Sequence, residues 1–210
     1  MNRFVEIYAN NEWGVGSGEG SLDFQTKGYQ KFLQKFLKQK RISSVVDMGC
    51  GDWQFSRYIN WEGISYIGYD VVPEVIAANI EKYSTNNISF KLYSGDPSEL
   101  PKSDLLIAKD VLQHLPNQPV LEFLQHLSKY RYALITNCTN PINGDLVNSD
   151  IPIGDFRYLD LRLPPFNLDA TLIYSFVHRE KQIKSKLKTI FRGYPRWKKI
   201  VLLVDNNCVD

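Results

Sequence analysis

A short apolar run that ends in a two-glycine loop constrains the fold of this chain more than any other feature. Residues 44–48 (SVVDM) are mostly apolar, Gly49-Cys50-Gly51 follows directly, and a second apolar run over residues 65–69 ends at Asp70. Such runs are typical of strands buried inside a parallel sheet, and parallel strands need long, usually helical, connections. The pattern therefore predicts an α/β fold with a parallel sheet.

The same alternation continues along the chain. Further strands are predicted at 88–92, 105–108, 132–137, 171–177 and 199–205. Helices are predicted at 24–40, 53–61, 73–83 and 118–129. If the last two strands form an antiparallel pair at one edge, the sheet has about seven strands, mostly parallel, with flanking helices.

No repeat and no linker divides the 210 residues, so we expect a single domain over residues 1–210. Residues 1–23 form its N-terminal arm, which is predicted to be irregular because glycine occupies every second position from 14 to 20. We expect residues 42–137 to form the α/β core, and residues 138–210 to form the remaining segment with the last strands.

Composition excludes several classes of protein. No apolar run approaches the roughly 18 residues of a membrane span, and the first residues (MNRFVEIYANNEW) lack the apolar region of a signal peptide. The three cysteines form no C-x-x-C pair, which argues against a disulfide framework and against a zinc site. We therefore expect a cytoplasmic protein.

Positive charge is concentrated near the C-terminus. Residues 179–199 contain nine Lys or Arg and one Glu, a net +8, so the rest of the chain carries −6 within the formal total of +2. This basic segment suggests an anionic partner, or it is simply a solvated lysine-rich face.

The glycine loop and Asp70 together predict a nucleotide-type ligand. Two glycines let the backbone turn sharply and let a ligand approach closely. Asp70 ends the second strand about 20 residues after the loop, where a carboxylate accepts hydrogen bonds from ribose hydroxyls.

A dinucleotide fits this loop poorly. Gln54 stands where the third glycine of the dinucleotide fingerprint belongs, and the charge of Asp52 would repel a pyrophosphate. A ligand with positive charge near Asp47 and Asp52 suits the loop better. S-adenosylmethionine, with its sulfonium and ammonium groups, is such a ligand.

These residues resemble the motifs of the class I S-adenosylmethionine-dependent methyltransferases. Residues 45–51 (VVDMGCG) look like the first motif, and Asp70 matches the acid that holds the ribose. Residues 95–97 (GDP) look like the segment that contacts adenine, and residues 104–115 look like the fourth motif. The resemblance covers residues 42–137.

The resemblance implies a Rossmann-like fold and S-adenosylmethionine as the cofactor. The cofactor-binding residues that we expect are Trp13, Asp47, Gly49, Cys50, Gly51, Asp70, Asp96 and Lys109. Trp13 would stack near the sulfonium from an arm folded over the cofactor. Many members have glycine where this chain has Asp52, so the contact made at that position differs.

Candidate catalytic residues follow the fourth predicted strand. His114 is predicted to act as the acid–base group, with Asp110 orienting it. A purely structural role, capping the turn before Pro116, is the alternative for His114. We assign no metal site, although Asp110, Asp155 and Asp160 are suitable ligand types.

Residues 154–160 (GDFRYLD) follow the fifth predicted strand, where this fold usually inserts substrate-binding segments. Asp155 and Arg157 are the predicted substrate-binding residues, because a guanidinium is a planar fork for a phosphate or carboxylate. A structural salt-bridge loop is the alternative.

Two functions remain open. The favoured one is O-methylation of a small polar acceptor, such as the sugar of a nucleotide-sugar or glycan. The other is a nucleic-acid (RNA) methyltransferase or a nucleic-acid-binding protein, which the basic segment with its Tyr194 and Trp197 would favour. A polynucleotide is the less favoured partner, because the rest of the chain is acidic and no Asn/Asp-Pro-Pro-Tyr loop is present.

Overall fold

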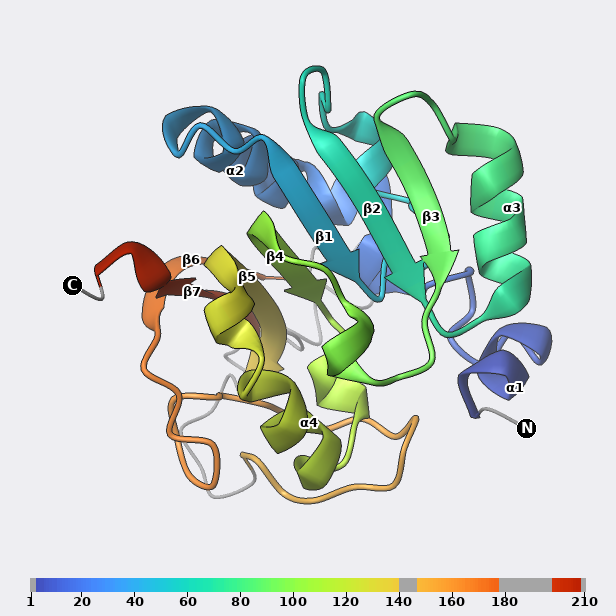
Figure 1. Cartoon of the computed structure of the whole chain (residues 1–210). Helices are drawn as coiled ribbons and strands as arrows, with labels where there is room; N and C mark the ends of the chain where they lie inside the picture. The colour runs from blue at the N-terminus through green and yellow to red at the C-terminus, as the bar shows by residue number, and fades with distance from the viewer. Residues whose placement is uncertain (1–2, 140–146, 178–197, 209–210) are drawn as a thin grey trace.

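One seven-stranded sheet forms the centre of the structure, a computed structural model that describes residues 3–139, 147–177 and 198–208 (Figure 1). Its strands are β1 (Ser44–Met48), β2 (Ser65–Asp70), β3 (Ile88–Leu92), β4 (Ser103–Lys109), β5 (Tyr130–Thr139), β6 (Thr171–Val177) and β7 (Lys198–Asp205). Their order is β3-β2-β1-β4-β5-β7-β6. The first five pair in parallel, and β7 runs antiparallel to β5 and β6. The predicted sheet, with its antiparallel edge pair, is confirmed.

Helices cover both faces of the sheet. They are α1 (Arg3–Ala9), α2 (Asp23–Gln39), α3 (Pro73–Tyr83) and α4 (Asn117–Leu124). Leu33 of α2 and Ile76 of α3 share a buried cluster with Val45, whereas Val120 of α4 shares the other cluster with Val46. Successive residues of β1 thus enter opposite cores, as the alternation of a strand requires. None of the helices in the described ranges has the length and apolar character of a membrane span.

The strand order places a crevice at one edge of the sheet. β1 pairs with β2 on one side and with β4 on the other, so the strand order reverses between β1 and β4. In open α/β sheets, ligands bind outside the carboxyl ends of the strands at this point. Figure 1 shows α1 beyond the arrowheads of β2 and β3, close to that edge.

The predicted helix over residues 53–61 is wrong. The segment contains only a 3-10 turn at Ser56–Tyr58, and Trp53 has a left-handed φ of +57°. Trp53, Phe55 and Trp61 are all buried in one cluster. Trp53 and Phe55 are two residues apart, and the irregular backbone directs both side chains to the same core, whereas a helix would direct them to different faces.

Two further boundaries differ from the prediction. The helix predicted to end at 129 ends at Leu124 and is followed by a 3-10 turn at Leu127–Lys129. The N-terminal arm is not irregular throughout, because α1 is helical. Ile7 of α1 is only 1% exposed, so tertiary packing stabilises a helix that is too short to form alone.

Candidate active site

A cavity of about 500 Å³ lies outside the carboxyl ends of β1, β2 and β4. We call it the glycine-loop cavity. Its lining includes Phe4, Tyr8, Trp13, Gly49–Gly51, Asp70, Ser94, Gly95, Lys109, Asp110 and His114. A cavity of this size holds a cofactor-sized ligand. The carboxyl ends of the first, second and fourth predicted strands therefore lie at one site. The N-terminal arm lines the same site.

The two loop glycines are required by both conformation and space. Gly49 and Gly51 have φ values of +72° and +54°. A Cβ atom at Gly49 would lie 2.3 Å from Val111 Cγ2, and one at Gly51 would lie 2.1 Å from Ser17 Oγ. Residues with a side chain rarely adopt this backbone conformation, and at these distances a Cβ atom would force the Val111 or Ser17 side chain to move.

Asp70 lies beside the glycine loop and lines the same cavity. Its Oδ2 accepts a hydrogen bond from the Gly51 N–H at 2.9 Å, and its Oδ1 accepts one from the Val72 N–H at 3.1 Å. Burial raises the pKa of Asp70 to about 6. A buried carboxylate fixed by backbone donors is a suitable acceptor for ribose hydroxyls.

The other predicted loop residues are arranged differently. Cys50 is buried and lines the cavity, as expected for a small residue. Asp47 lies beneath the loop and outside the cavity lining, where its Oδ2 accepts a hydrogen bond from Tyr66 Oη at 2.6 Å. Burial raises the pKa of Asp47 to about 6. Asp96 is exposed and caps the turn after it, with its Oδ1 2.8 Å from the Ser98 N atom.

The N-terminal arm is attached to the glycine loop through Asp52. Ser17 Oγ donates to Asp52 Oδ1 at 2.6 Å, and the Asp52 N–H donates back to Ser17 Oγ at 2.9 Å. Tyr8 Oη lies 2.8 Å from the same Ser17 oxygen. The aspartate that departs from the methyltransferase motif therefore holds the arm over the cavity. Trp13, in that arm, lines the cavity.

A second pocket of about 460 Å³ adjoins the glycine-loop cavity. Both are lined by Trp13, Ser17, Ser21, Asp110 and His114. Gln113, Cys138 and Lys199 line only the second pocket. We call these shared lining residues the shared wall. Ligands bound in the two pockets would be closest to each other beside it, and it contains both predicted catalytic residues, Asp110 and His114.

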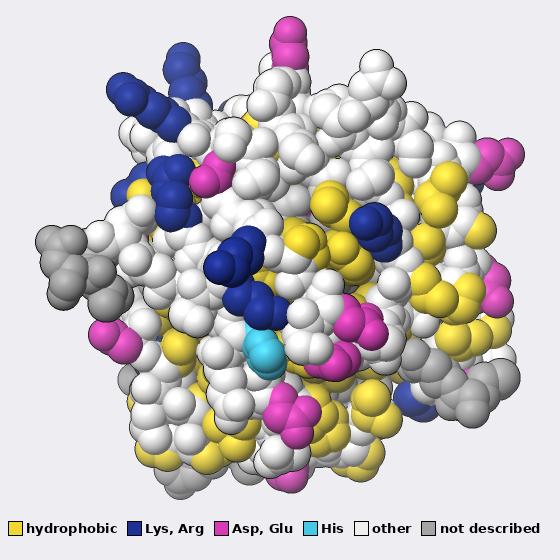
Figure 2. All heavy atoms as spheres, in the orientation of Figure 1, with side chains coloured by type: hydrophobic (Ala, Val, Ile, Leu, Met, Phe, Trp, Pro, Cys, Tyr) yellow, Lys and Arg dark blue, Asp and Glu magenta, His cyan; other side chains and the backbone are white. Residues whose placement is uncertain are grey.

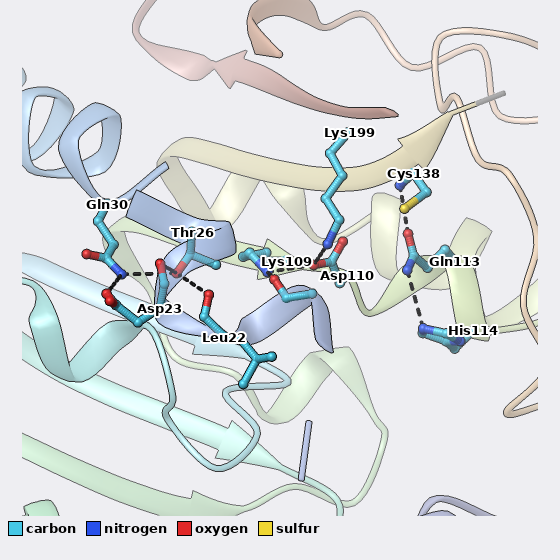
Figure 3. Close-up of polar contacts among 11 residues, drawn as sticks. Leu22, Asp23, Thr26, Gln30, Lys109, Asp110, Gln113, His114, Cys138 and Lys199 are labelled. Atoms are coloured by element: carbon cyan, nitrogen blue, oxygen red, sulfur yellow. Dashed lines mark hydrogen bonds and ion pairs between the residues drawn. The ribbon is translucent and has the colours of Figure 1, made fainter. Parts of the chain in front are cut away.

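Asp110 pairs with two lysines at this wall. Its Oδ2 lies 2.5 Å from Lys109 Nζ and 2.5 Å from Lys199 Nζ, which reach it from β4 and β7 (Figure 3). Burial alone would raise the pKa of Asp110, but the two ammonium groups hold it well below its usual range. We call these three residues the Lys–Asp–Lys cluster. Asp110 is therefore a charged partner of lysines, and among the described contacts it makes no hydrogen bond through which it would orient His114.

His114 is oriented by other groups. Its Nδ1 lies 2.9 Å from the backbone oxygen of Asp155, and its Nε2 lies 3.3 Å from Gln113 Nε2. The Gln113 Oε1 accepts a hydrogen bond from the Cys138 N–H at 2.7 Å, so its amide nitrogen faces the imidazole (Figure 3). The Trp13 ring packs beside the imidazole at 5.1 Å between centroids.

This network fixes the tautomer of His114. A carbonyl oxygen can only accept, so Nδ1 carries the proton, and Nε2 is the acceptor nitrogen. Burial lowers the pKa of His114, which favours the neutral ring. The imidazole thus presents a basic nitrogen in the wall between the two cavities.

Arg157 lines neither cavity. The side chain is 3% exposed, and its guanidinium donates to Asn117 Oδ1, to the Ser149 oxygen at 2.8 Å and to the Leu115 oxygen at 2.7 Å. Asp155 is exposed and holds His114 through its backbone. These contacts favour a structural role for Arg157 over direct binding of a substrate.

We expect Arg157→Met to lower the free energy of unfolding by about 3 kcal/mol, because three partly buried acceptors lose a buried, charged donor. Thermal and urea denaturation measure this effect. Arg131→Met is the matched control, because the Arg131–Asp104 pair is partly exposed and is expected to contribute less than about 1 kcal/mol. Wild-type stability of Arg157→Met together with weaker acceptor binding would return Arg157 to a substrate-binding role.

The remaining expectations concern metal ions and the basic segment. Asp160, one of the three aspartates named as suitable metal ligands, forms an ion pair with Arg162 at 2.7 Å. Within the described residues, no three His, Cys, Asp or Glu side chains are grouped as metal ligands. Of the basic segment 179–199, residues 179–197 lie outside the described residues. Lys199 forms an ion pair with Asp110.

Sequence reasoning missed three site residues: Ser17, Gln113 and Lys199. Their partners lie 35, 25 and 89 residues away in the chain. Asp52 was the one available signal for Ser17, since a charged residue in a glycine loop needs a partner. A lysine at the start of an apolar strand was the signal for Lys199.

Comparison with known proteins agrees with this geometry. The profile of a family described as a methyltransferase domain matches residues 22–163. No curated protein sequence matches the chain.

Several solved structures share the fold. TehB from Haemophilus influenzae has a TM-score of 0.59 at 19% identity, over 89% of this chain and 67% of that one. Magnesium protoporphyrin IX methyltransferase from Synechocystis PCC 6803, with bound SAH, has a TM-score of 0.58 at 15% identity, over 95% and 96%. The methyltransferase domain of bacterial CtHen1-CN has a TM-score of 0.56 at 14% identity, over 84% and 97%. With its family profile, its sheet order and its glycine-loop cavity, the chain belongs to the methyltransferase-domain family and is a class I S-adenosylmethionine-dependent methyltransferase.

Proposed function

We propose that this methyltransferase acts on a hydroxyl oxygen of a small polar acceptor, such as the sugar of a nucleotide-sugar or glycan, held in the second pocket. The glycine-loop cavity is the proposed cofactor site, in which Asp70 holds the ribose and the glycine loop allows close approach. When bound there, S-adenosylmethionine supplies a methyl group on a positively charged sulfur.

The observation that carries this proposal is the orientation of His114. A hydroxyl becomes a better nucleophile when a base takes its proton, and a base must be within hydrogen-bond reach of that proton. His114 Nε2 is unprotonated and lies in the wall that the two cavities share. Its 3.3 Å separation from Gln113 Nε2 is long for a hydrogen bond, so an acceptor hydroxyl can take that place.

Trp13 and Ser17 complete the enclosure on the solvent side. Both line the two cavities, and the Ser17–Asp52 hydrogen bonds hold the arm in position. Exclusion of water helps a reaction in which charge is neutralised as the new bond forms. The proposed role of the arm is therefore to cover both ligands during transfer.

Gln113→Met tests whether Gln113 sets the pKa of His114. The amide N–H donates to Nε2 and so favours the neutral ring, which means that its loss should raise the pKa of His114. One hydrogen bond of about 0.5–1.5 kcal/mol corresponds to roughly 0.4–1 pH unit. The acidic limb of the kcat/KM profile, which reports the free enzyme, is therefore expected to move to higher pH by about that amount, because the ring then protonates at a higher pH.

A purely structural role of Gln113 would lower stability and leave the acidic limb in place. Gln118→Met is the control, because Gln118 is exposed and bonds only to Glu122 in the same helix among the contacts that the structure describes.

Transfer of a labelled methyl group to a panel of sugars, nucleotide-sugars, glycans and RNA tests the function itself. O-methylation of a small sugar acceptor supports the proposal. Exclusive methylation of RNA, with binding that falls steeply with salt, would overturn it. The structure supports the small acceptor, because Lys199 of the basic segment is buried. On the face shown in Figure 2, basic and acidic side chains are interspersed, and the described side chains form no continuous basic stripe.

A further inference from the structure

The Lys–Asp–Lys cluster carries more positive than negative charge. Two ammonium groups share one carboxylate, and both bond to the same oxygen, Asp110 Oδ2. Asp110 Oδ1 is buried and has no hydrogen-bond partner among the described residues. Lys109 and Lys199 are 6% and 5% exposed. Charges that are removed from water need compensation by other charges or by hydrogen bonds, and one carboxylate provides it for only one of two cations.

Lys109 has compensation besides Asp110. Its Nζ lies 3.4 Å from the Gly20 backbone oxygen, 5.0 Å from the centroid of the Phe55 ring and 6.0 Å from that of Tyr29. A carbonyl oxygen and the faces of two aromatic rings attract a cation. Lys109 lines only the glycine-loop cavity.

Lys199 is compensated less well. In the described part of the chain, its Nζ has one hydrogen-bond acceptor, Asp110 Oδ2. An ammonium has three N–H donors, so two remain to be satisfied. Burial alone would lower the pKa of Lys199, but Asp110 raises it above its usual value, so the group is charged. This cation lines the second pocket.

Apart from Asp110, the acidic residues that line the second pocket do not neutralise Lys199. Glu12 pairs with Arg3 at 2.6 Å. Glu19 is exposed to solvent, which screens its charge. The second pocket therefore contains a buried, charged donor whose remaining N–H groups have no acceptor among the residues that the structure describes.

We infer that the acceptor carries an anionic group, a carboxylate or a phosphate, which binds Lys199 Nζ in the second pocket. The inference rests on the proposed function and narrows it to charged sugars. An anion there completes the hydrogen bonds of Lys199 and balances the charge of the cluster. With its anionic group on Lys199, the acceptor would lie along the pocket wall that His114 shares.

Matched pairs of acceptors test this inference. Glucuronate and its methyl ester, and glucose 6-phosphate and glucose, differ within each pair chiefly by the anionic charge. We expect the anionic member to have a kcat/KM about 10- to 150-fold higher, the range for a hydrogen bond to a charged group. Lys199→Met should abolish the preference, and Lys199→Arg should retain it. Lys198→Met, at the exposed neighbouring residue, should leave it unchanged.

Saturation-transfer NMR gives a readout that is independent of turnover. With S-adenosylhomocysteine present, glucuronate or glucose 6-phosphate should bind the wild-type protein and not Lys199→Met, and cofactor binding shows that the variant is folded. Equal methylation of both members of each pair would overturn the anion site and leave O-methyl transfer intact. Loss of anion binding in Lys199→Met, without methylation of any sugar, would support the anion site and refute the proposed function. Preference for the carboxylate or for the phosphate pair identifies the anion.

Discussion

His114→Ala is expected to lower turnover by about 100-fold or more, with the affinity for S-adenosylhomocysteine close to that of the wild type. The variant removes the only group in the shared wall for which the described contacts identify an unprotonated acceptor nitrogen. Because burial lowers the pKa of His114 from its usual 6.5, the wild-type ring stays neutral at neutral pH. Turnover should therefore fall only as the pH drops below that lowered pKa, where Nε2 becomes protonated. This acidic limb should disappear in the variant.

Steady-state kinetics across pH, with cofactor calorimetry, checks this expectation. His126→Ala is the matched control, because His126 lies at the end of α4 and lines neither cavity. Surviving turnover with weakened cofactor binding would show that His114 is a wall of the cofactor site and that the base lies elsewhere.

Asp70→Ala is expected to weaken S-adenosylhomocysteine binding by about 10- to 150-fold, or about 1.5–3 kcal/mol. The physical reason is the loss of a buried carboxylate whose position is fixed by the backbone of the glycine loop. Isothermal titration calorimetry measures the change. Undiminished affinity in a folded variant would refute the assignment of Asp70 to the ribose.

Asp70→Asn keeps the size of the side chain and separates binding from folding. The pKa of Asp70 is raised to about 6, so the folded protein holds this proton more tightly than the unfolded chain. The stability that this proton contributes is therefore lost as the pH rises from about 4 to about 6, and the neutral amide avoids that loss. At pH 8 the variant should remain folded while it binds the cofactor weakly. Asp104→Asn is the control, because Asp104 lies at the start of β4, away from the cavity.

The parallel sheet was predictable because its signals are local. β1, α3, β3 and β6 begin and end where the apolar pattern places them, and the last two strands pair as expected. The segment after the glycine loop was not predictable in this way. Its aromatic residues fill the core from an irregular backbone, and the contacts of Trp53 with Tyr66, Tyr83 and Phe90 come from β2, β3 and the end of α3.

The cofactor half of the site was largely visible in the sequence, and the acceptor half was not. The glycine loop and Asp70 follow the ends of adjacent strands, so their order along the chain implies their proximity. On the acceptor side, residue type was a poor guide. Arg157 is of a type suited to binding a phosphate, but its guanidinium is buried and donates to backbone oxygens of Ser149 and Leu115. Residue type alone does not show which way a side chain points.

The sequence by itself determined the α/β class, the glycine loop with its strand-end aspartate and the cofactor, because strand period, turn residues and strand-end carboxylates are properties of short segments. Only the tertiary structure decided the contacts of the acceptor side. Asp110 meets Lys199, 89 residues away, and Gln113 meets Cys138, 25 residues away. Such contacts form when β7 inserts antiparallel beside β5 and brings its first residues to the carboxyl edge of the sheet. Burial and neighbouring charges then decide which of these groups are charged, and this cannot be predicted from the sequence around each residue.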